Sequence, residues 1–328
     1  MSARRQVTEA LDRRDFLRHV SAGAAALALA GPAAVTAGES DPTRAAPTGN
    51  DGEDPLFRIS LAEWSLHRAL QSGEIDNLEF PIVAKRDYGI EAVEYVNTFF
   101  KDRATDQAYL MTLLDRCNAA GVRSLLIMCE EEGRLGDPDG AARTLAVENH
   151  YRWVEAARVL GCHSIRVNAA SEGSWEEQRD RAAEGLSRLA EFADGYGVDI
   201  IVENHGGLSS NGRWLSSVIT TADHPRLGTL PDFGNFRIGE SERYDNYQGV
   251  EQLMPFARAV SAKTLDFDED GDEVDLDYER LIRIVLDAGY RGWIGIEYEG
   301  QRLSEPEGIR RTLALLEKVR GRLAPEYG

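Results

Sequence analysis

Residues 198–205 read Val-Asp-Ile-Ile-Val-Glu-Asn-His, a short β-branched apolar run that ends in polar residues. Runs of this kind are typical of buried β-strands. Similar runs recur with onsets about 30 to 40 residues apart, and they cover residues 57–66, 89–96, 122–129, 162–168, 227–232, 259–265 and 293–298. The sequence therefore predicts eight strands.

The stretches between these runs carry the periodicity of amphipathic helices. Apolar residues follow this spacing at positions 182, 186, 189 and 193, and again at 281, 285 and 288. Asp137-Pro138 has the pattern of an N-cap followed by proline at the first helical position. Four glycines stand where helices should end: Gly121, Gly161, Gly197 and Gly289.

Strands that alternate with helices pair in parallel through right-handed crossovers. Eight such units within about 270 residues predict an α/β fold, a single (β/α)8 TIM barrel. An open doubly wound sheet is the alternative, and the absence of a GxGxxG turn after the first predicted strand disfavours it. In a barrel, functional residues lie at the carboxyl ends of the strands and in the loops that follow them.

The first 37 residues differ in composition from the rest. The run Arg13-Arg14-Asp15-Phe16-Leu17-Arg18 resembles a twin-arginine export motif, and an Ala-rich apolar run follows over residues 20–30. We expect residues 1–37 to be a twin-arginine signal peptide, 38–55 a flexible linker and 56–328 the barrel. The protein would then be exported to the periplasm or the extracellular space. A basic amphipathic helix lying on the domain is the alternative interpretation of the first segment.

The composition excludes several classes of partner. The 328 residues include 56 acidic and 37 basic ones, and the formal net charge of −19 would repel a phosphodiester backbone, so we expect no nucleic acid. No later stretch approaches 18 consecutive apolar residues, so we expect no stable membrane insertion. Cys117, Cys129 and Cys162 are too few and too unevenly placed for a disulfide framework, and we interpret them as packed thiols. Assembly into a homo-oligomer stays open.

Three carboxylates stand at predicted strand ends: Glu203, Asp232 in Leu-Pro-Asp-Phe-Gly-Asn, and Glu297 in Ile-Gly-Ile-Glu-Tyr-Glu. Unpaired carboxylates at a barrel mouth are costly. A divalent cation with oxygen ligands is the usual solution, and Mn, Mg, Co and Zn all suit it. A salt bridge to a neighbouring Arg or Lys is the alternative for each acid. We predict that the three acids share one metal.

These positions carry a resemblance to the xylose isomerase-like TIM barrel superfamily, which contains sugar isomerases and epimerases and, more distantly, metal-dependent endonucleases. The resemblance spans residues 56–322 and rests on Val202-Glu203-Asn204-His205, Pro231-Asp232-Phe233-Gly234-Asn235, Ala259-Val260-Ser261-Ala262-Lys263 and Gly295-Ile296-Glu297. It implies that Glu203, Asp232 and Glu297 bind the metal together with a histidine on the seventh strand. Ser261 occupies that histidine's position here, and a serine hydroxyl is a poor ligand. His205 is the candidate replacement ligand; a substrate hydrogen bond is its alternative role.

Lys263 lies two residues beyond Ser261 and so faces the same side of its strand. Its ammonium could polarise a carbonyl or move a proton, and a solvated lysine that balances the acids is the alternative. Other polar and aromatic side chains near strand ends could contact a hydroxyl-rich substrate or, alternatively, form part of the barrel's own structure. These candidates are Trp64, His67, Glu94, Arg166, Asn168 and Asn235.

Residues 266–277 follow the pattern Asp-x-Asp-x-Asp-Gly-x5-Asp, close to that of a calcium loop. The last position is Asp rather than Glu and a strand precedes the loop, so an acidic loop with Asp277 as a helix N-cap is favoured. The loops after the last two strands are dominated by acids, with Arg302 alone opposing them. They lack the glycines or clustered arginines that grip a phosphate, which disfavours a phosphorylated sugar.

Together these features predict a metal-dependent isomerase or epimerase of a non-phosphorylated sugar or keto-sugar. Glu203 or Glu297 would remove the proton next to the carbonyl, an acid on the other face would return it, and Lys263 would assist. The same chemistry could end in elimination of a glycosidic group, which would make the protein a lyase. Ser261 favours a non-catalytic sugar-binding barrel as a further alternative. The scarcity of histidines and the negative charge disfavour an endonuclease-type phosphodiesterase.

Overall fold

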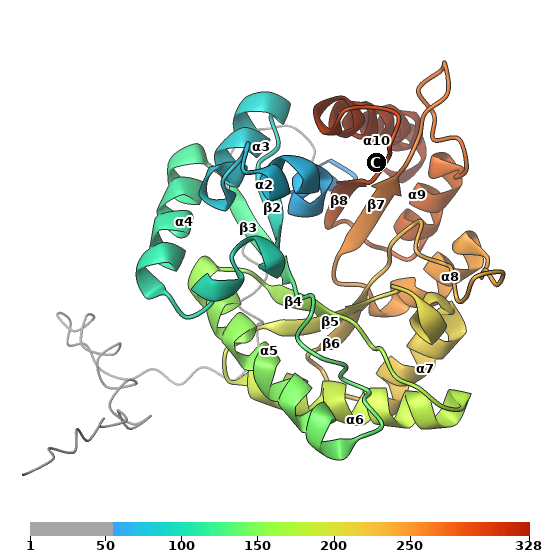
Figure 1. The fold of residues 1–328 in the computed structure, drawn as a ribbon. Coiled ribbons are helices and arrows are strands. Elements are labelled where there is room, and N and C mark those ends of the chain that lie inside the picture. Colours follow the sequence, from blue (N-terminus) through green and yellow to red (C-terminus); the bar gives the residue numbers. More distant parts are fainter. Residues whose placement is uncertain (1–54) are drawn as a thin grey trace, which may run out of the picture. The chain divides into compact units, whose positions relative to one another are not determined.

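A computed structural model describes residues 55–328, and the expected signal peptide and residues 38–54 of the expected linker lie outside the described residues. Eight parallel strands form one curled sheet with helices around it (Figure 1). They are β1 (Arg58–Ala62), β2 (Ala92–Val96), β3 (Arg123–Met128), β4 (Ser164–Val167), β5 (Asp199–Glu203), β6 (Leu227–Leu230), β7 (Val260–Thr264) and β8 (Trp293–Tyr298). The predicted (β/α)8 architecture is confirmed.

Helical segments follow every strand. The α-helices are α2 (His67–Ser72), α3 (Phe80–Tyr88), α4 (Gln107–Ala120), α5 (Gly140–Leu160), α6 (Trp175–Asp194), α7 (Gly212–Ala222), α8 (Asn246–Leu253), α9 (Tyr278–Asp287) and α10 (Glu305–Tyr327). Short 3-10 helices occupy several loops: η1 (Glu63–Leu66), η2 (Asn77–Glu79), η3 (Asn97–Phe99), η4 (Lys101–Arg103), η5 (Gly207–Ser210) and η6 (Met254–Phe256). Of these, η1 and η3 directly follow β1 and β2, so they turn the chain at the carboxyl ends of these strands.

Helix ends follow the expected capping chemistry, with one correction. Gly161 ends α5 in the left-handed conformation, at φ 75°. The predicted start of α5 at Asp137-Pro138 is wrong by two residues, because Asp139 is the N-cap and accepts a hydrogen bond from the Ala142 N–H at 2.8 Å. The Asp137 carboxylate instead accepts the Asp139 N–H at 2.9 Å, so it forms the turn before the helix.

The barrel closes at a seam between β6 and β7. Regular pairing runs in the order β6-β5-β4-β3-β2-β1-β8-β7, and only isolated parallel bridges join its two ends, Thr229 with Ala257 and Asp232 with Ser261. Pro231 has no N–H to donate, but its carbonyl accepts the Ser261 N–H at 2.9 Å. The seam therefore sets Asp232 beside Ser261.

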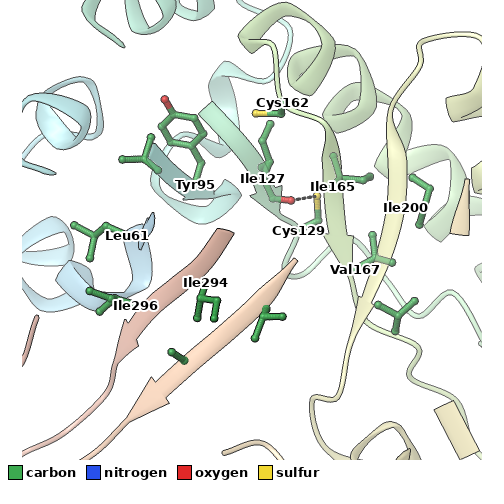
Figure 2. Close-up of a cluster of buried hydrophobic side chains, with 14 of the residues drawn as sticks. Leu61, Tyr95, Ile127, Cys129, Cys162, Ile165, Val167, Ile200, Ile294 and Ile296 are labelled. Atoms are coloured by element: carbon green, nitrogen blue, oxygen red, sulfur yellow. Dashed lines mark hydrogen bonds between the residues drawn. The ribbon is translucent and has the colours of Figure 1, made fainter. Parts of the chain in front are cut away.

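Two apolar clusters lie on opposite faces of the strands. The larger one packs between strands and helices and includes Leu61, Tyr95, Ile127, Ile165, Ile200 and Ile296 (Figure 2). The smaller one fills the barrel interior with Ala62, Val96, Leu126, Met128, Ile201, Leu230 and Ala259. Residues two apart on a strand share a face, so the side chains at 203, 232 and 261 continue the interior columns that begin at 201, 230 and 259.

The three cysteines are buried free thiols, as predicted, and Cys129 and Cys162 lie within the larger core (Figure 2). Asp277 caps α9 by accepting the Arg280 N–H at 3.0 Å, also as predicted. Within residues 55–328, no helix has the length and apolar character needed to span a bilayer.

Candidate metal centre and active site

Three carboxylates meet at the carboxyl ends of β5, β6 and β8. Glu203 ends β5, Asp232 follows β6 by two residues, and Glu297 lies in β8. One oxygen from each lies within 4.8 Å of the other two. Glu203 and Asp232 have no exposed surface and Glu297 is 3% exposed. The structure thus brings together the three acids that the sequence analysis singled out.

Asp232 is held by donors from its own loop and from β7. Its Oδ1 accepts the Gly234 and Asn235 N–H groups at 2.8 and 2.7 Å, and its Oδ2 lies 2.7 Å from the Ser261 hydroxyl. Burial raises the pKa of Asp232 to about 8, although the Lys263 ammonium opposes the rise. At neutral pH this carboxyl therefore keeps a proton unless a cation takes the proton's place.

Ser261 lies between two of the acids, at the position where the resemblance implied a histidine. Its Oγ is 2.7 Å from Asp232 Oδ2 and 2.9 Å from Glu297 Oε2. A hydroxyl carries a single proton and can donate to only one of these oxygens, so a proton on Asp232 would satisfy both contacts. Ser261 holds Asp232 and Glu297 together and offers no nitrogen ligand.

Glu203 is oriented by an amide and a guanidinium. Asn235 Nδ2 donates to Glu203 Oε1 at 2.7 Å. Arg166 Nε lies 2.7 Å from Glu203 Oε2 as an ion pair, but without hydrogen-bond geometry, so this buried oxygen has no hydrogen-bond donor within the described chain. The Arg166 guanidinium also bonds to Glu130. Although partial burial alone would raise it, Arg166 holds the pKa of Glu130 below its usual value.

Lys263 is a buried cation beside Glu297. Its Nζ lies 3.2 Å from Glu297 Oε1 and 3.3 Å from Glu299 Oε1, and its side chain is 6% exposed. Burial opposes the charged form, but Asp232 and Glu297 hold the pKa of Lys263 well above its usual value. The side chain is therefore a charged ammonium and not a solvated rim lysine.

Glu94 lies inside the barrel and is fully buried, away from the rim where a substrate contact was expected. Its Oε1 accepts the Ser60 hydroxyl at 2.6 Å, and its Oε2 has no hydrogen-bond partner in the described residues. A Cβ at Gly295 would lie 2.5 Å from Oε1, so the glycine makes room for this carboxylate. Burial raises the pKa of Glu94 to about 7 despite the Ser60 hydrogen bond.

The buried charges of this region do not balance. Four buried carboxylates face two buried cations; these are Glu94, Glu203, Asp232 and Glu297 against Arg166 and Lys263. Two negative charges remain without a buried counter-ion, and only protons or a cation can neutralise them in a low-dielectric interior. A divalent metal ion fits this excess of buried carboxylates over buried cations. It also fits Glu203 Oε2, which has no hydrogen-bond donor within the described chain, and the cluster of three hard oxygen ligands.

The remaining predicted site residues lie around this centre. The Trp64 ring stacks on His67 with centroids 4.8 Å apart, and Phe99 tilts against Trp64 at 6.1 Å. Asn168 donates to Glu130 at 3.1 Å. The His205 side chain is exposed and is not part of the three-acid cluster, although it lies close enough to Glu130 to help lower the pKa of that carboxyl.

Glu130 and Glu299 contact Arg166 and Lys263 but are not among the site residues predicted from the sequence. Glu130 follows β3 two residues beyond Met128, which faces the barrel interior, and Glu299 follows Glu297 by two. The strand-end rule used for β5, β6 and β8 would have found Glu130 if it had been applied to β3.

The comparisons with known proteins agree with this architecture. Solved structures with the same fold include a D-psicose 3-epimerase from Clostridium cellulolyticum H10 with D-tagatose, at TM-score 0.64 and 12% identity, covering 80% of this chain and 99% of that one. The IolI protein with a bound zinc atom has TM-score 0.63 and 14% identity, with 81% and 99% covered. A xylose isomerase-like TIM barrel protein from Mycobacterium smegmatis in complex with magnesium has TM-score 0.61 and 15% identity, with 81% and 98% covered.

No curated protein matches the sequence. Identities this low show a shared fold and not a shared reaction. The family model described as xylose isomerase-like TIM barrel matches residues 83–319, which include the three clustered acids. This chain belongs to the xylose isomerase-like TIM barrel family.

Proposed function

We propose that the protein is a metal-dependent isomerase or epimerase of a non-phosphorylated sugar or keto-sugar, which moves a proton next to a carbonyl. The observation that carries the proposal is the group of three buried acids, in surroundings that hold four buried carboxylates and only two buried cations. Two similar structures add support, since one is a sugar epimerase and another holds zinc. Mn, Mg, Co and Zn all suit such oxygen donors.

Glu203, Asp232 and Glu297 would hold the cation, which supplies Lewis-acid polarisation of the substrate's hydroxyl and carbonyl oxygens. Of these acids, Glu203 and Glu297 come from strands on different sides of the group, so one would accept the proton from carbon and the other would return it. Asn235 fixes the orientation of the Glu203 carboxylate through its hydrogen bond at 2.7 Å. The charged Lys263 would stabilise negative charge that develops on the substrate oxygen.

The place of action is part of the proposal. The Arg13-Arg14 run supports export by the twin-arginine route, and that route would deliver the protein to the periplasm or the extracellular space. A neutral sugar is the substrate class that agrees with the acidic loops after β7 and β8, because these loops would repel a phosphate.

The direct test is hydrogen exchange into substrate carbon. The full chain with added Mn²⁺ would be incubated in D2O with D-fructose, D-psicose, D-tagatose and L-ribulose, and proton NMR would follow deuterium uptake at the carbon beside the carbonyl. We expect uptake with at least one ketose, and its loss in Glu203→Gln and Glu297→Gln. Glu317→Gln, on the surface of α10, is the matched control and should leave uptake unchanged.

The two alternatives give other outcomes in the same experiment. A lyase, given a glycoside in place of the free ketoses, would form an unsaturated product instead of an epimer. A non-catalytic sugar-binding barrel would bind sugar with no deuterium uptake by any variant. The Ser261 hydroxyl between Asp232 and Glu297 and the ion pair of Lys263 with Glu297 would suit this alternative. Binding without uptake would overturn the catalytic proposal.

A further inference from the structure

A hollow of about 370 Å³ lies between the end of α2 and the turn that follows β2. Its lining includes Leu70, Gln71, Ile75, Asp76, Thr98 and Phe99. This volume lies within the range of small-molecule sites, about 300 to 1,000 Å³. None of the residues described above as part of the metal centre lines it, so the hollow is a separate feature.

Phe99 connects the hollow to the barrel mouth. Its ring lines the hollow and also packs against the apolar cluster inside the barrel, which contains Ala62 and Val96. The neighbouring Trp64 packs against the same cluster, and its ring centroid is 6.1 Å from that of Phe99. Phe99 therefore borders both the hollow and the barrel interior, with Trp64 next to it. Flat rings of this kind are surfaces on which sugar rings can pack their apolar faces.

The polar groups of the hollow are ones that recognise hydroxyls. The Gln71 amide forms no hydrogen bond with the described residues, and the Thr98 hydroxyl has no partner among them either. Asp76 uses one oxygen to cap the turn at Leu78 N–H, at 2.8 Å, which leaves the other oxygen for a ligand. An amide, a hydroxyl and a carboxylate beside an aromatic ring suit a polyhydroxylated ligand.

The floor of the hollow is rigid. The Asn77 side chain donates to buried Glu63 at 2.7 Å and accepts the Tyr109 hydroxyl at 2.7 Å, so both ends of its amide are engaged. Glu63 in turn accepts the Val96 N–H at 2.8 Å, which ties this floor to β2. A ligand would therefore meet a preformed site and would not have to order the floor on binding.

The charge of the lining excludes anionic ligands. Asp76 is the sole charged side chain among the residues that line the hollow, and none of them is Lys or Arg. A phosphate, sulfate or uronate would meet a carboxylate and no cation. The occupant that fits is a neutral, hydroxyl-rich group.

We infer that this hollow is a second sugar subsite, so that the substrate is a neutral glycoside whose reacting ring lies at the metal centre and whose second sugar lies beyond Phe99. The inference rests on the proposed function and narrows its substrate class to glycosides. Recognition would come from the Phe99 ring and from hydroxyl contacts to Gln71, Asp76 and Thr98, whose buried hydroxyl would turn toward the ligand on binding.

The test compares ketoses with disaccharides that contain them. Dissociation constants for D-fructose, turanose, maltulose and lactulose would be measured by titration calorimetry on the full chain with added Mn²⁺. We expect at least one disaccharide to bind about tenfold or more tightly than D-fructose. Gln71→Ala and Thr98→Val should each reduce that ratio at least threefold. Gln107→Ala, an exposed residue at the start of α4, is the matched control and should leave the ratio unchanged.

The outcomes separate this inference from the proposed function. Ketose binding with no preference for any disaccharide, or a preference that Gln71→Ala and Thr98→Val leave intact, would overturn the second subsite alone. Failure of all four sugars to bind, together with no deuterium uptake from any of the free ketoses, would overturn the proposed function as well as the subsite. Circular dichroism of each variant would show that it is folded, and the exposed position of Gln71 makes its variant the safer one.

Discussion

Replacing Lys263 with methionine would remove the ammonium of the centre at nearly constant side-chain length. The ammonium lies 3.2 Å from Glu297 and 3.3 Å from Glu299. Breaking a buried ion pair costs about 3 to 5 kcal/mol, and the 31% exposure of the Glu299 side chain favours the low end. Without metal, we expect Lys263→Met to lower the free energy of unfolding by about 3 kcal/mol.

The same substitution should tighten metal binding. At an effective dielectric constant of about 20, a divalent cation and an ammonium about 5 Å apart repel by roughly 7 kcal/mol, which is an upper bound. Relief of only one fifth of that repulsion, about 1.4 kcal/mol, would already lower the Kd for the metal tenfold. The loss of an oxyanion-stabilising charge should at the same time lower kcat by about 10²-fold.

Three measurements decide the matter: urea unfolding with EDTA, calorimetric titration with Mn²⁺, and the rate of deuterium uptake. Lys318→Met is the matched control, because it removes an ammonium that pairs with Asp272 on the outer side of the barrel. Weaker Mn²⁺ binding in Lys263→Met would refute the electrostatic argument. An unchanged uptake rate would show that Lys263 is only a counter-ion of the acids.

Three further predictions concern pH, packing and export. Burial raises the pKa of Asp232 to about 8, so about one carboxyl in a hundred is ionised at pH 6 and half are ionised at pH 8. Calorimetry should therefore show the affinity for Mn²⁺ rising up to about fiftyfold from pH 6 to pH 8, and an unchanged affinity would contradict the raised pKa. Gly295→Ala should lower the free energy of urea unfolding by about 1 to 3 kcal/mol, because the added Cβ would clash with the Glu94 carboxylate, and by much less when Glu94→Ser is also present. Additive effects of the two substitutions would disprove this clash. Replacing Arg13 and Arg14 by lysine should keep the protein out of the periplasmic fraction, and normal export of this variant would refute the twin-arginine signal peptide.

The clustered acids could be predicted because each follows an apolar strand directly. A carboxylate after Ile-Ile-Val, as at Glu203, must emerge at the carboxyl end of its strand, and a barrel gathers such ends in one place. The resemblance then identified Ser261 as the position of the missing histidine. That Ser261 would bond to Asp232 and Glu297 at once depends on side-chain distances that sequence spacing does not contain.

Other parts of the site depend on tertiary packing. Glu94 and Glu203 both belong to strands, but Glu94 faces the interior beside Gly295 and Glu203 lies nearer the mouth. The sequence pattern does not show how deep in the barrel each carboxylate lies. The hollow beside Phe99 is lined by residues 70, 71, 73, 75–77, 98 and 99, which come together only because β1 and β2 are neighbours. Asp137 and Asp139 are both good caps, and one local hydrogen bond decided between them.

The seam between β6 and β7 has a kinetic consequence. Isolated bridges and a proline stand there in place of a regular ladder, so local opening of the barrel should cost least at this seam. Asp232 lies on one side of the seam and Glu297 on the strand beyond β7, so any ligand that engages both would link the two edges. Amide exchange at Ser261 would then slow as that ligand binds, because the ligand would strengthen a closure that otherwise depends on isolated bridges.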